Sequence, residues 1–201
     1  MTQRLRRCRG FTLTELLVTV AVASILAMIA VPSFLTLMRR QRVAGSYNSL
    51  VASLQYARTE AINRGAYVAV CPTTSTTKNA ATCSGSTSYE TGWLVYSYPV
   101  SLGTNLSYDA TKAQLLRLTS TQAAVSIRAA DGNVITFGQQ GQVQPLNATS
   151  AHNVQFAVCA LANGTSGLGQ NTSSVPGALL TLSGSGGIKN TQLSSGAACT
   201  P

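Results

Sequence analysis

The feature that most constrains this chain is an uncharged apolar run close to its N-terminus. No charged side chain occurs at residues 16–38, a run of 23 positions. As an α-helix this run would extend about 34 Å, enough to cross the hydrocarbon core of a bilayer. Four arginines precede it, and three more follow it, which weakens the charge asymmetry but leaves a basic leader in front. We therefore expect a transmembrane helix over residues 11–38, with the leader held on the cytoplasmic side of the inner membrane.

The run does not have the pattern of an ordinary secretory signal, which is cut after its apolar region at small residues. Alanines are scattered through the run, so the pattern alone leaves such a cleavage open, as it does an uncleaved signal anchor. Glu15 favours a different interpretation. It is a lone carboxylate at the start of an otherwise apolar helix, where a charge is costly and usually functional.

The segment GFTLTELLVTVAVASILAMIAVPSF, residues 10–34, resembles the N-terminus of type IV pilins and type II secretion pseudopilins. The resemblance implies that a prepilin peptidase cuts after Gly10 and methylates the new N-terminus at Phe11, so that residues 1–10 are a cleaved leader. It also implies that Glu15 pairs with the α-amino group of a neighbouring subunit during filament assembly. A carboxylate in hydrocarbon needs a cation, and the new ammonium at Phe11 supplies one. Pro32 matches a helix-kinking proline of this family, and it lacks the donor for an interior helix bond.

An amphipathic stripe continues the helix beyond the apolar run. Apolar residues from Val43 to Ala61 recur at steps of three and four positions, with Arg58 and Glu60 off the stripe. Gly65 fits a C-cap. We expect one helix that ends near residue 64, whose part at residues 39–65 packs on a domain.

Beyond Gly65 the sequence predicts a β-rich periplasmic domain over residues 66–201. Short runs of Val, Ile, Tyr and Phe alternate with turn residues, and residues 73–89 and 163–177 are expected as loops. Asp131-Gly132-Asn133 predicts a hairpin turn between two of the strands, and Trp93 is expected in the core. The fold class is α+β, pilin-like, with a long N-terminal helix packed on a C-terminal antiparallel β-sheet domain. The expected strands are 66–71, 92–98, 114–118, 124–128, 134–137, 154–159, 178–182 and 187–192.

The segments at residues 49–72 and 91–98 resemble one branch of the superfamily, which holds the GspH and FimT/FimU minor pilins and pseudopilins. The resemblance implies a structural role as a minor pilin within, or capping, a type IV filament together with other pilins. A pseudopilin of the type II secretion system is the alternative within the same class. The Cys71-Pro72 and Gly92-Trp93 pairs look more like the pilus members. The other matching residues are Leu54, Gln55, Ala57, Arg58, Glu60 and Ala61.

Five cysteines are present, and Cys8 lies in the leader. Four lie beyond the apolar run, and an even number on an exported side suggests two disulfides. Four cysteines allow three connectivities; we favour the pair that closes a short loop and the pair that secures the C-terminus, while free buried thiols remain the alternative. The favoured pairs are Cys71–Cys83 and Cys159–Cys199.

DNA binding for uptake is a third candidate function. Some FimT-type proteins are implied to bind DNA through a C-terminal Gly-Arg-x-Arg stretch, and the nearest match here is Gly186-Gly187-Ile188-Lys189. Glycine and lysine replace the two arginines, which removes the guanidinium forks that bind phosphate. From residue 43 onward seven basic side chains stand against four acidic ones, so the domain carries only about +3. A glycine turn before a last strand explains the stretch better than a nucleic-acid site.

Nothing in the sequence predicts an enzyme, a cofactor or a metal site. His152 is the single histidine and has no Cys, Asp or Glu partner at a catalytic or metal-binding spacing. The domain has too few acidic residues for a carboxylate pair to be expected.

Overall fold

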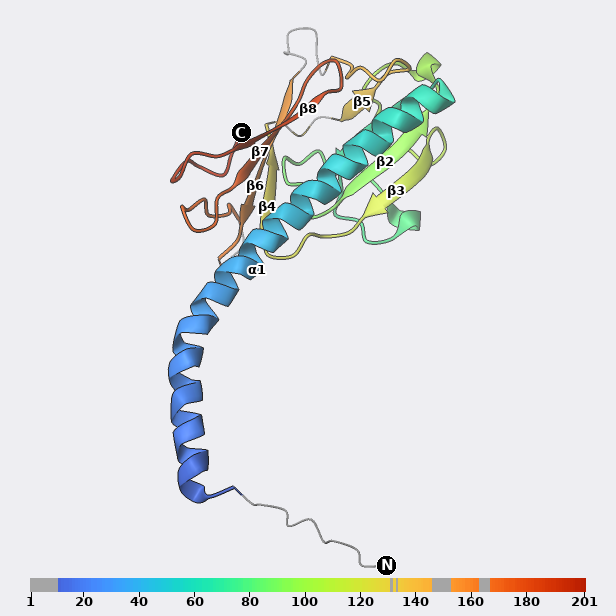
Figure 1. The fold of residues 1–201 in the computed structure, drawn as a ribbon. Helices are drawn as coiled ribbons and strands as arrows, with labels where there is room; N and C mark the ends of the chain where they lie inside the picture. Colours follow the sequence, from blue (N-terminus) through green and yellow to red (C-terminus); the bar gives the residue numbers. More distant parts are fainter. Residues whose placement is uncertain (1–10, 131, 133, 146–152, 163–166) are drawn as a thin grey trace, which may run out of the picture. The chain divides into compact units, whose positions relative to one another are not determined.

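The computed structural model of the 201-residue chain describes residues 11–130, 132, 134–145, 153–162 and 167–201. The chain divides into two compact units, Met1–Met38 and Arg39–Pro201. One helix, α1 (Leu13–Arg64), begins in the first unit and ends in the second (Figure 1). Over the described residues, α1 is the one helix whose length and apolar composition suffice to cross a membrane.

The described part of the first unit is almost entirely the exposed N-terminal portion of α1. None of its apolar side chains is buried within the chain. Its hydroxyl groups donate to carbonyl oxygens of the helix itself: Thr19 Oγ1 to Leu16 O at 2.8 Å, and Thr36 Oγ1 to Pro32 O at 3.1 Å. An apolar helix with internally satisfied polar groups matches the requirements of a lipid or protein environment.

In the described part of the second unit, eight strands form two four-stranded antiparallel sheets. The first sheet has the order β3-β2-β1-β5, and the second has the order β4-β6-β7-β8. In the first sheet the strands are β1 (Tyr67–Pro72), β2 (Trp93–Tyr98), β3 (Gln114–Thr119) and β5 (Ile135–Phe137). In the second they are β4 (Val125–Ala129), β6 (Val154–Ala160), β7 (Ala178–Leu182) and β8 (Ile188–Gln192).

The main core lies between the C-terminal half of α1 and both sheets. Leu50 and Leu54 are fully buried there, and each contributes about 2–3 kcal/mol of hydrophobic stabilisation. The first sheet is covered on both faces, because Val70 belongs to this core while its neighbour Cys71 belongs to a second, smaller cluster. The helix stripe buried in the main core consists of Val43, Tyr47, Leu50, Leu54, Ala57 and Ala61.

The α+β fold class, with a long N-terminal helix packed on antiparallel sheets, is confirmed, and each predicted strand matches an observed one to within one residue at either end. The predicted hairpin is wrong. β4 pairs with β6 in the second sheet, whereas β5 pairs with β1 in the first. The segment between β4 and β5 is therefore a crossing between sheets; of its turn residues, Asp131 and Asn133 lie outside the described residues. Two 3-10 helices, Lys78–Ala80 and Val100–Leu102, were not predicted.

Candidate functional site

The N-terminal end of α1 carries the carboxylate that the sequence analysis singled out. Thr12 precedes the helix, and its Oγ1 accepts a hydrogen bond from the backbone N–H of Glu15 at 3.3 Å. Thr12 thus occupies the Ncap position and Glu15 the N3 position, and a carboxylate in the first turn also interacts favourably with the helix dipole. The sequence analysis missed this capping role, although the Thr-x-x-Glu spacing was a visible signal.

Glu15 is the single charged residue of the sequence between residues 11 and 38. Its side chain is exposed, as is that of Phe11, which has 80% of its surface accessible. No ion pair of the described residues includes Glu15. Gly10, on the other side of the predicted cleavage site, lies outside the described residues.

Pro32 lies inside α1, which is continuous through this position. Proline has no N–H to donate to the carbonyl of Met28, four residues earlier, so one interior helix bond is missing there. Whether the helix kinks at Pro32 in a membrane stays a prediction.

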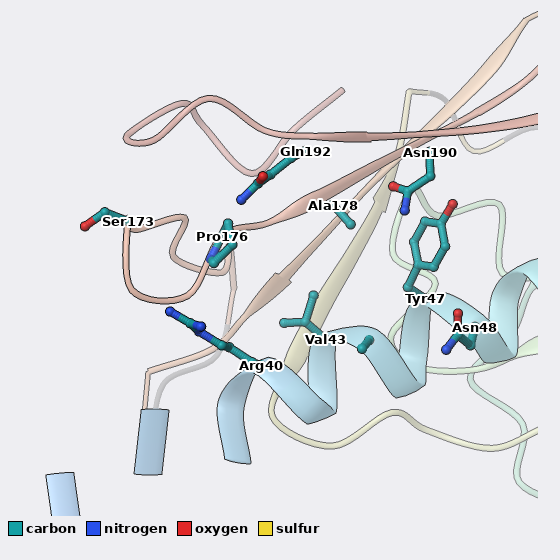
Figure 2. Close-up of a pocket in the computed structure, with 10 residues that line it drawn as sticks. Arg40, Val43, Tyr47, Asn48, Ser173, Pro176, Ala178, Asn190 and Gln192 are labelled. Carbon is teal, nitrogen blue, oxygen red and sulfur yellow. The ribbon is translucent and has the colours of Figure 1, made fainter. Parts of the chain in front are cut away.

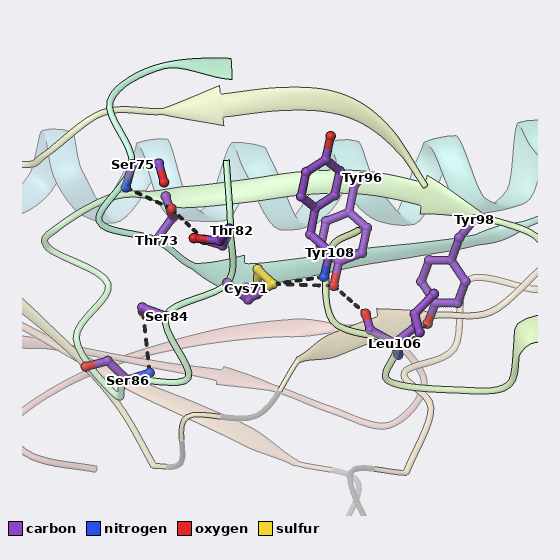
Figure 3. The surroundings of a disulfide bond; sticks show 11 residues. Cys71, Thr73, Ser75, Thr82, Ser84, Ser86, Tyr96, Tyr98, Leu106 and Tyr108 are labelled. Carbon is purple, nitrogen blue, oxygen red and sulfur yellow. Dashed lines mark hydrogen bonds between the residues drawn. A yellow bond between two sulfur atoms is a disulfide. The ribbon is translucent and has the colours of Figure 1, made fainter. Parts of the chain in front are cut away.

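The first disulfide, Cys71–Cys83, joins β1 to the loop that follows it, with the two Cα atoms 5.6 Å apart (Figure 3). The backbone N–H of Tyr108 donates to Cys83 Sγ at 3.3 Å, and the hydroxyl of Tyr96 donates to the carbonyl of Leu106 at 2.6 Å. Burial raises the pKa of the Tyr96 phenol above its ordinary value. The bridge and the tyrosines thus fix two loops over the face of the first sheet that α1 does not cover.

The second disulfide, Cys159–Cys199, joins the central strand β6 to the end of the chain, with a Cα–Cα distance of 6.1 Å. Gly177 packs against it: a β-carbon at this position would lie 2.6 Å from Cys159 Sγ. The two bridges are the pairs favoured in the sequence analysis. Both attach loops or the C-terminus to a sheet.

The glycine stretch considered for DNA binding forms the turn between β7 and β8. Gly186 has φ +79° and contacts the backbone of Gly141, so only glycine fits there without strain. Arg58 of α1 donates to this turn, from Nη1 to the carbonyl of Gly186 at 3.1 Å and from Nη2 to that of Ser185 at 3.2 Å. Lys189 follows on β8 with its side chain exposed.

Arg58 is a residue whose role the sequence analysis missed. Its position off the apolar stripe suggested a solvated side chain, whereas it is half-buried and holds the β7–β8 turn against α1. The two glycines beside it, Gly141 and Gly186, both have positive φ and leave room for the guanidinium. The glycine turn is therefore explained as a structural element. Lys189 lacks the neighbouring arginines that the implied DNA-binding motif would have.

No cluster of three or more His, Cys, Asp or Glu side chains that could hold a metal occurs within the part of the chain that the structure describes. His152 lies outside the described residues. The partly buried ion pair Arg128–Glu90, 2.6 Å between Nη2 and Oε1, instead fixes a loop to strand β4, since Glu90 also accepts from the backbone N–H of Ile127.

A groove of about 450 Å³ lies between the beginning of the domain's helix and the strands β7 and β8 (Figure 2). Its apolar lining comes from both sides of the groove, and amide side chains and one arginine complete it. The sequence analysis did not predict it. The residues that line it are Arg40, Val43, Ala44, Tyr47, Asn48, Ser173, Pro176, Ala178, Asn190 and Gln192.

Comparison with known families gives two matches. Residues 46–190 match the family described as type II transport protein GspH, and residues 5–31 match the prokaryotic N-terminal methylation motif. The first match covers well over half of the chain and includes both sheets. The second covers the predicted cleavage site and the first turns of α1.

Two solved structures are similar, both crystal forms of the type IV minor pilin FimU of Pseudomonas aeruginosa. One is 19% identical, with a TM-score of 0.48, and covers 79% of this chain and 93% of that chain. The other is also 19% identical, with a TM-score of 0.46, and covers 77% and 95%. A comparison with curated proteins found no match.

Proposed function

The chain belongs to the GspH family of pilin-like structural subunits, and we propose that it is a minor pilin built into, or capping, a type IV pilus. The observation that carries the proposal is the N-terminal part of α1. It is an exposed apolar helix with one carboxylate in its first turn, continuous with the helix that forms the core of the domain. Such a helix needs apolar partners, which either lipid or the helices of other subunits supply.

Assembly on this proposal begins with cleavage between Gly10 and Phe11. Prepilin peptidase removes the basic leader, and methylation of Phe11 leaves a cationic amine at the new N-terminus. An unpaired carboxylate in hydrocarbon costs on the order of 3 kcal/mol. Glu15 of one subunit loses this penalty when it pairs with the amine of a neighbour, so pairing favours entry into the filament and fixes the axial register of the two helices.

The proposed location is the inner membrane, crossed once, with the C-terminal domain in the periplasm and then in a filament. Two disulfides support an oxidising compartment for the domain, because such bonds persist outside the cytoplasm. The leader arginines support the same orientation before cleavage.

A second candidate is a pseudopilin of the type II secretion system. The description of the matching family, a type II transport protein, favours it. Deletion of the gene separates the two: loss of surface pili with secretion intact supports the pilus role, and loss of secreted enzymes with pili intact supports the secretion role.

Glu15→Ala tests the assembly role. We expect the variant to be processed normally, as reported by the mass of the membrane-extracted protein, but to be depleted from filaments sheared off the cell. Glu60→Ala is the matched control, because Glu60 is also a glutamate of α1 but pairs with Arg64 within the domain. Equal amounts of the Glu15 variant and the native chain in sheared filaments would refute the role of this carboxylate.

A further inference from the structure

The two sheets have four edge strands, and the chain itself covers two of them. Residues 87–89 pair with β4, where the N–H of Tyr89 donates to the carbonyl of Ile127 at 2.8 Å. Residues 142–144 cover β5, where the N–H of Gln144 donates to the carbonyl of Thr136 at 2.7 Å. Among the described residues no such backbone cover lies on β3 or β8. An uncovered edge presents unpaired backbone groups that can accept another strand.

The register of β7 and β8 determines which backbone groups of β8 are unpaired. The N–H of Ser183 donates to the carbonyl of Gly187, and the N–H of Leu193 donates to that of Gly177. Hydrogen-bonded and non-bonded pairs alternate along an antiparallel ladder. With the observed register, residues 187, 189, 191 and 193 bond to β7. The N–H and C=O groups of Ile188, Asn190 and Gln192 therefore face the free edge.

The edge of β8 also borders the groove of Figure 2. The side chains of Asn190 and Gln192 line it, because alternate residues of a strand point to the same face. The apolar lining includes Tyr47 and Ala178. An extended peptide added to β8 would thus gain backbone bonds at the edge, amide partners along it and an apolar surface for its alternate side chains. A groove of similar volume also borders β3, but of that strand only Gln114 lines it.

Arg40 is the one charged residue that lines the groove. Its Nε donates to the carbonyl of Ser174 at 2.5 Å, and no ion pair of the described residues includes it. The acidic residues described in the domain are paired elsewhere: Glu60 with Arg64, Glu90 with Arg128 and Asp109 with Lys112. No acidic side chain among the described residues of the domain is therefore left for Arg40. Arg40 and Gln192 lie toward the same end of the groove in Figure 2.

We propose that the groove and the free edge of β8 bind an extended segment of a neighbouring pilin-like subunit, which adds as a strand and places an acidic side chain on Arg40. The identity of the partner rests on the proposed function. The positive charge of Arg40 favours an acidic segment. The free backbone N–H and C=O groups at residues 188, 190 and 192 favour an extended one.

The test measures binding of a defined peptide to the isolated full chain in detergent micelles, so it is independent of filament assembly. The probe is a fluorescent, acetylated and amidated peptide of sequence Asp-Thr-Val-Thr-Val-Thr, whose aspartate reaches the Arg40 end when the peptide pairs antiparallel to β8. Fluorescence anisotropy reports binding. The comparison peptide has asparagine in place of aspartate.

We expect saturable binding that weakens about fivefold with Arg40→Gln or with the asparagine peptide, the effect of one partly exposed ion pair. Asn190→Pro should abolish binding, because it removes a free-edge N–H, a position where an edge strand tolerates proline. Gln192→Pro is the second such variant if the first fails to fold. Asn190→Ala keeps the N–H and loses only the side-chain amide, so it should weaken binding less than Asn190→Pro does. Arg117→Gln on the other open edge is the matched control for Arg40→Gln.

No saturable binding, equal binding of both peptides, or binding unaffected by either proline would overturn the proposal. Concentration-dependent self-association that Asn190→Pro abolishes would overturn the assignment to an acidic partner and identify a second copy as the occupant. In each of these cases the filament role stands, because its own test is the incorporation of the Glu15 variant.

Discussion

Removing each disulfide should destabilise the domain by an amount that follows the length of the loop it closes. The bridges span sequence separations of 12 residues for Cys71–Cys83 and 40 residues for Cys159–Cys199. The chain-entropy relation then gives about 3 kcal/mol for the first and about 4 kcal/mol for the second at 25 °C. Cys71 and Cys159 are both fully buried, whereas Cys83 is half-buried and Cys199 is buried. Replacing the second pair by alanine therefore removes somewhat more packing, which acts in the same direction as its longer loop.

Trp93 makes the measurement direct. It is the single tryptophan of the chain and is fully buried in the main core, so its fluorescence reports unfolding of the domain. The two alanine pairs are compared with the native chain by urea titration of the full protein in a mild detergent. With a slope of about 2 kcal/mol/M, the midpoints should fall by about 1.5 M and about 2 M.

The prediction depends on which of the two disulfides, when removed, lowers the free energy of unfolding more. If the variant without Cys71–Cys83 is as unstable as the variant without Cys159–Cys199, or less stable, the entropic account fails and local contacts such as the one from Tyr108 to Cys83 determine the stability. A chain that lacks both bridges is the control: dithiothreitol should lower the midpoint of the native chain and leave that of the control unchanged.

Three further outcomes follow from single residues. Gly92→Ala should destabilise the domain by about 1–3 kcal/mol in the same titration, because the glycine has φ +122° and a β-carbon would lie 2.5 Å from the carbonyl oxygen of Thr119. Arg58→Met should cost about 1.5–3 kcal/mol, because it removes charge-assisted bonds to the β7–β8 turn but keeps the apolar stem. Burial raises the pKa of Tyr96, so the contribution of this phenol to stability should be constant below pH 10 and should decrease above it as the unfolded chain ionises; Tyr96→Phe should reduce that decrease.

The sequence predicted the elements of this fold well because their signals are local. The strands are short runs of β-branched and aromatic residues bounded by turn residues. The amphipathic stripe from Val43 to Ala61 belongs to the same continuous helix as the apolar run. The pairing of the strands is not a local property. Asp131-Gly132-Asn133 is a good turn sequence, yet β5 pairs with β1, whose residues lie 65 to 69 positions earlier in the chain (Val68 opposite Phe137, for example).

The difference between local and long-range signals also explains which residues of the candidate sites could be found from the sequence. Glu15 was found because a charge within an apolar run is visible in the sequence itself. Arg58 was missed because its acceptors are backbone carbonyls 127 and 128 positions away, and a backbone carbonyl has no sequence signature. The nearest signal was indirect: glycines with positive φ at 141 and 186, which leave space for its guanidinium.

The groove depends on register in a way that composition cannot reveal. The turn that Gly186 closes places Asn190 and Gln192 on the groove side of β8 and Lys189 on the other face. A slip of one residue would reverse every side chain of the strand, so a lysine would enter the groove and two amides would leave it. The turn at Gly186 therefore determines whether this edge presents amide groups or a second cation to a neighbouring strand.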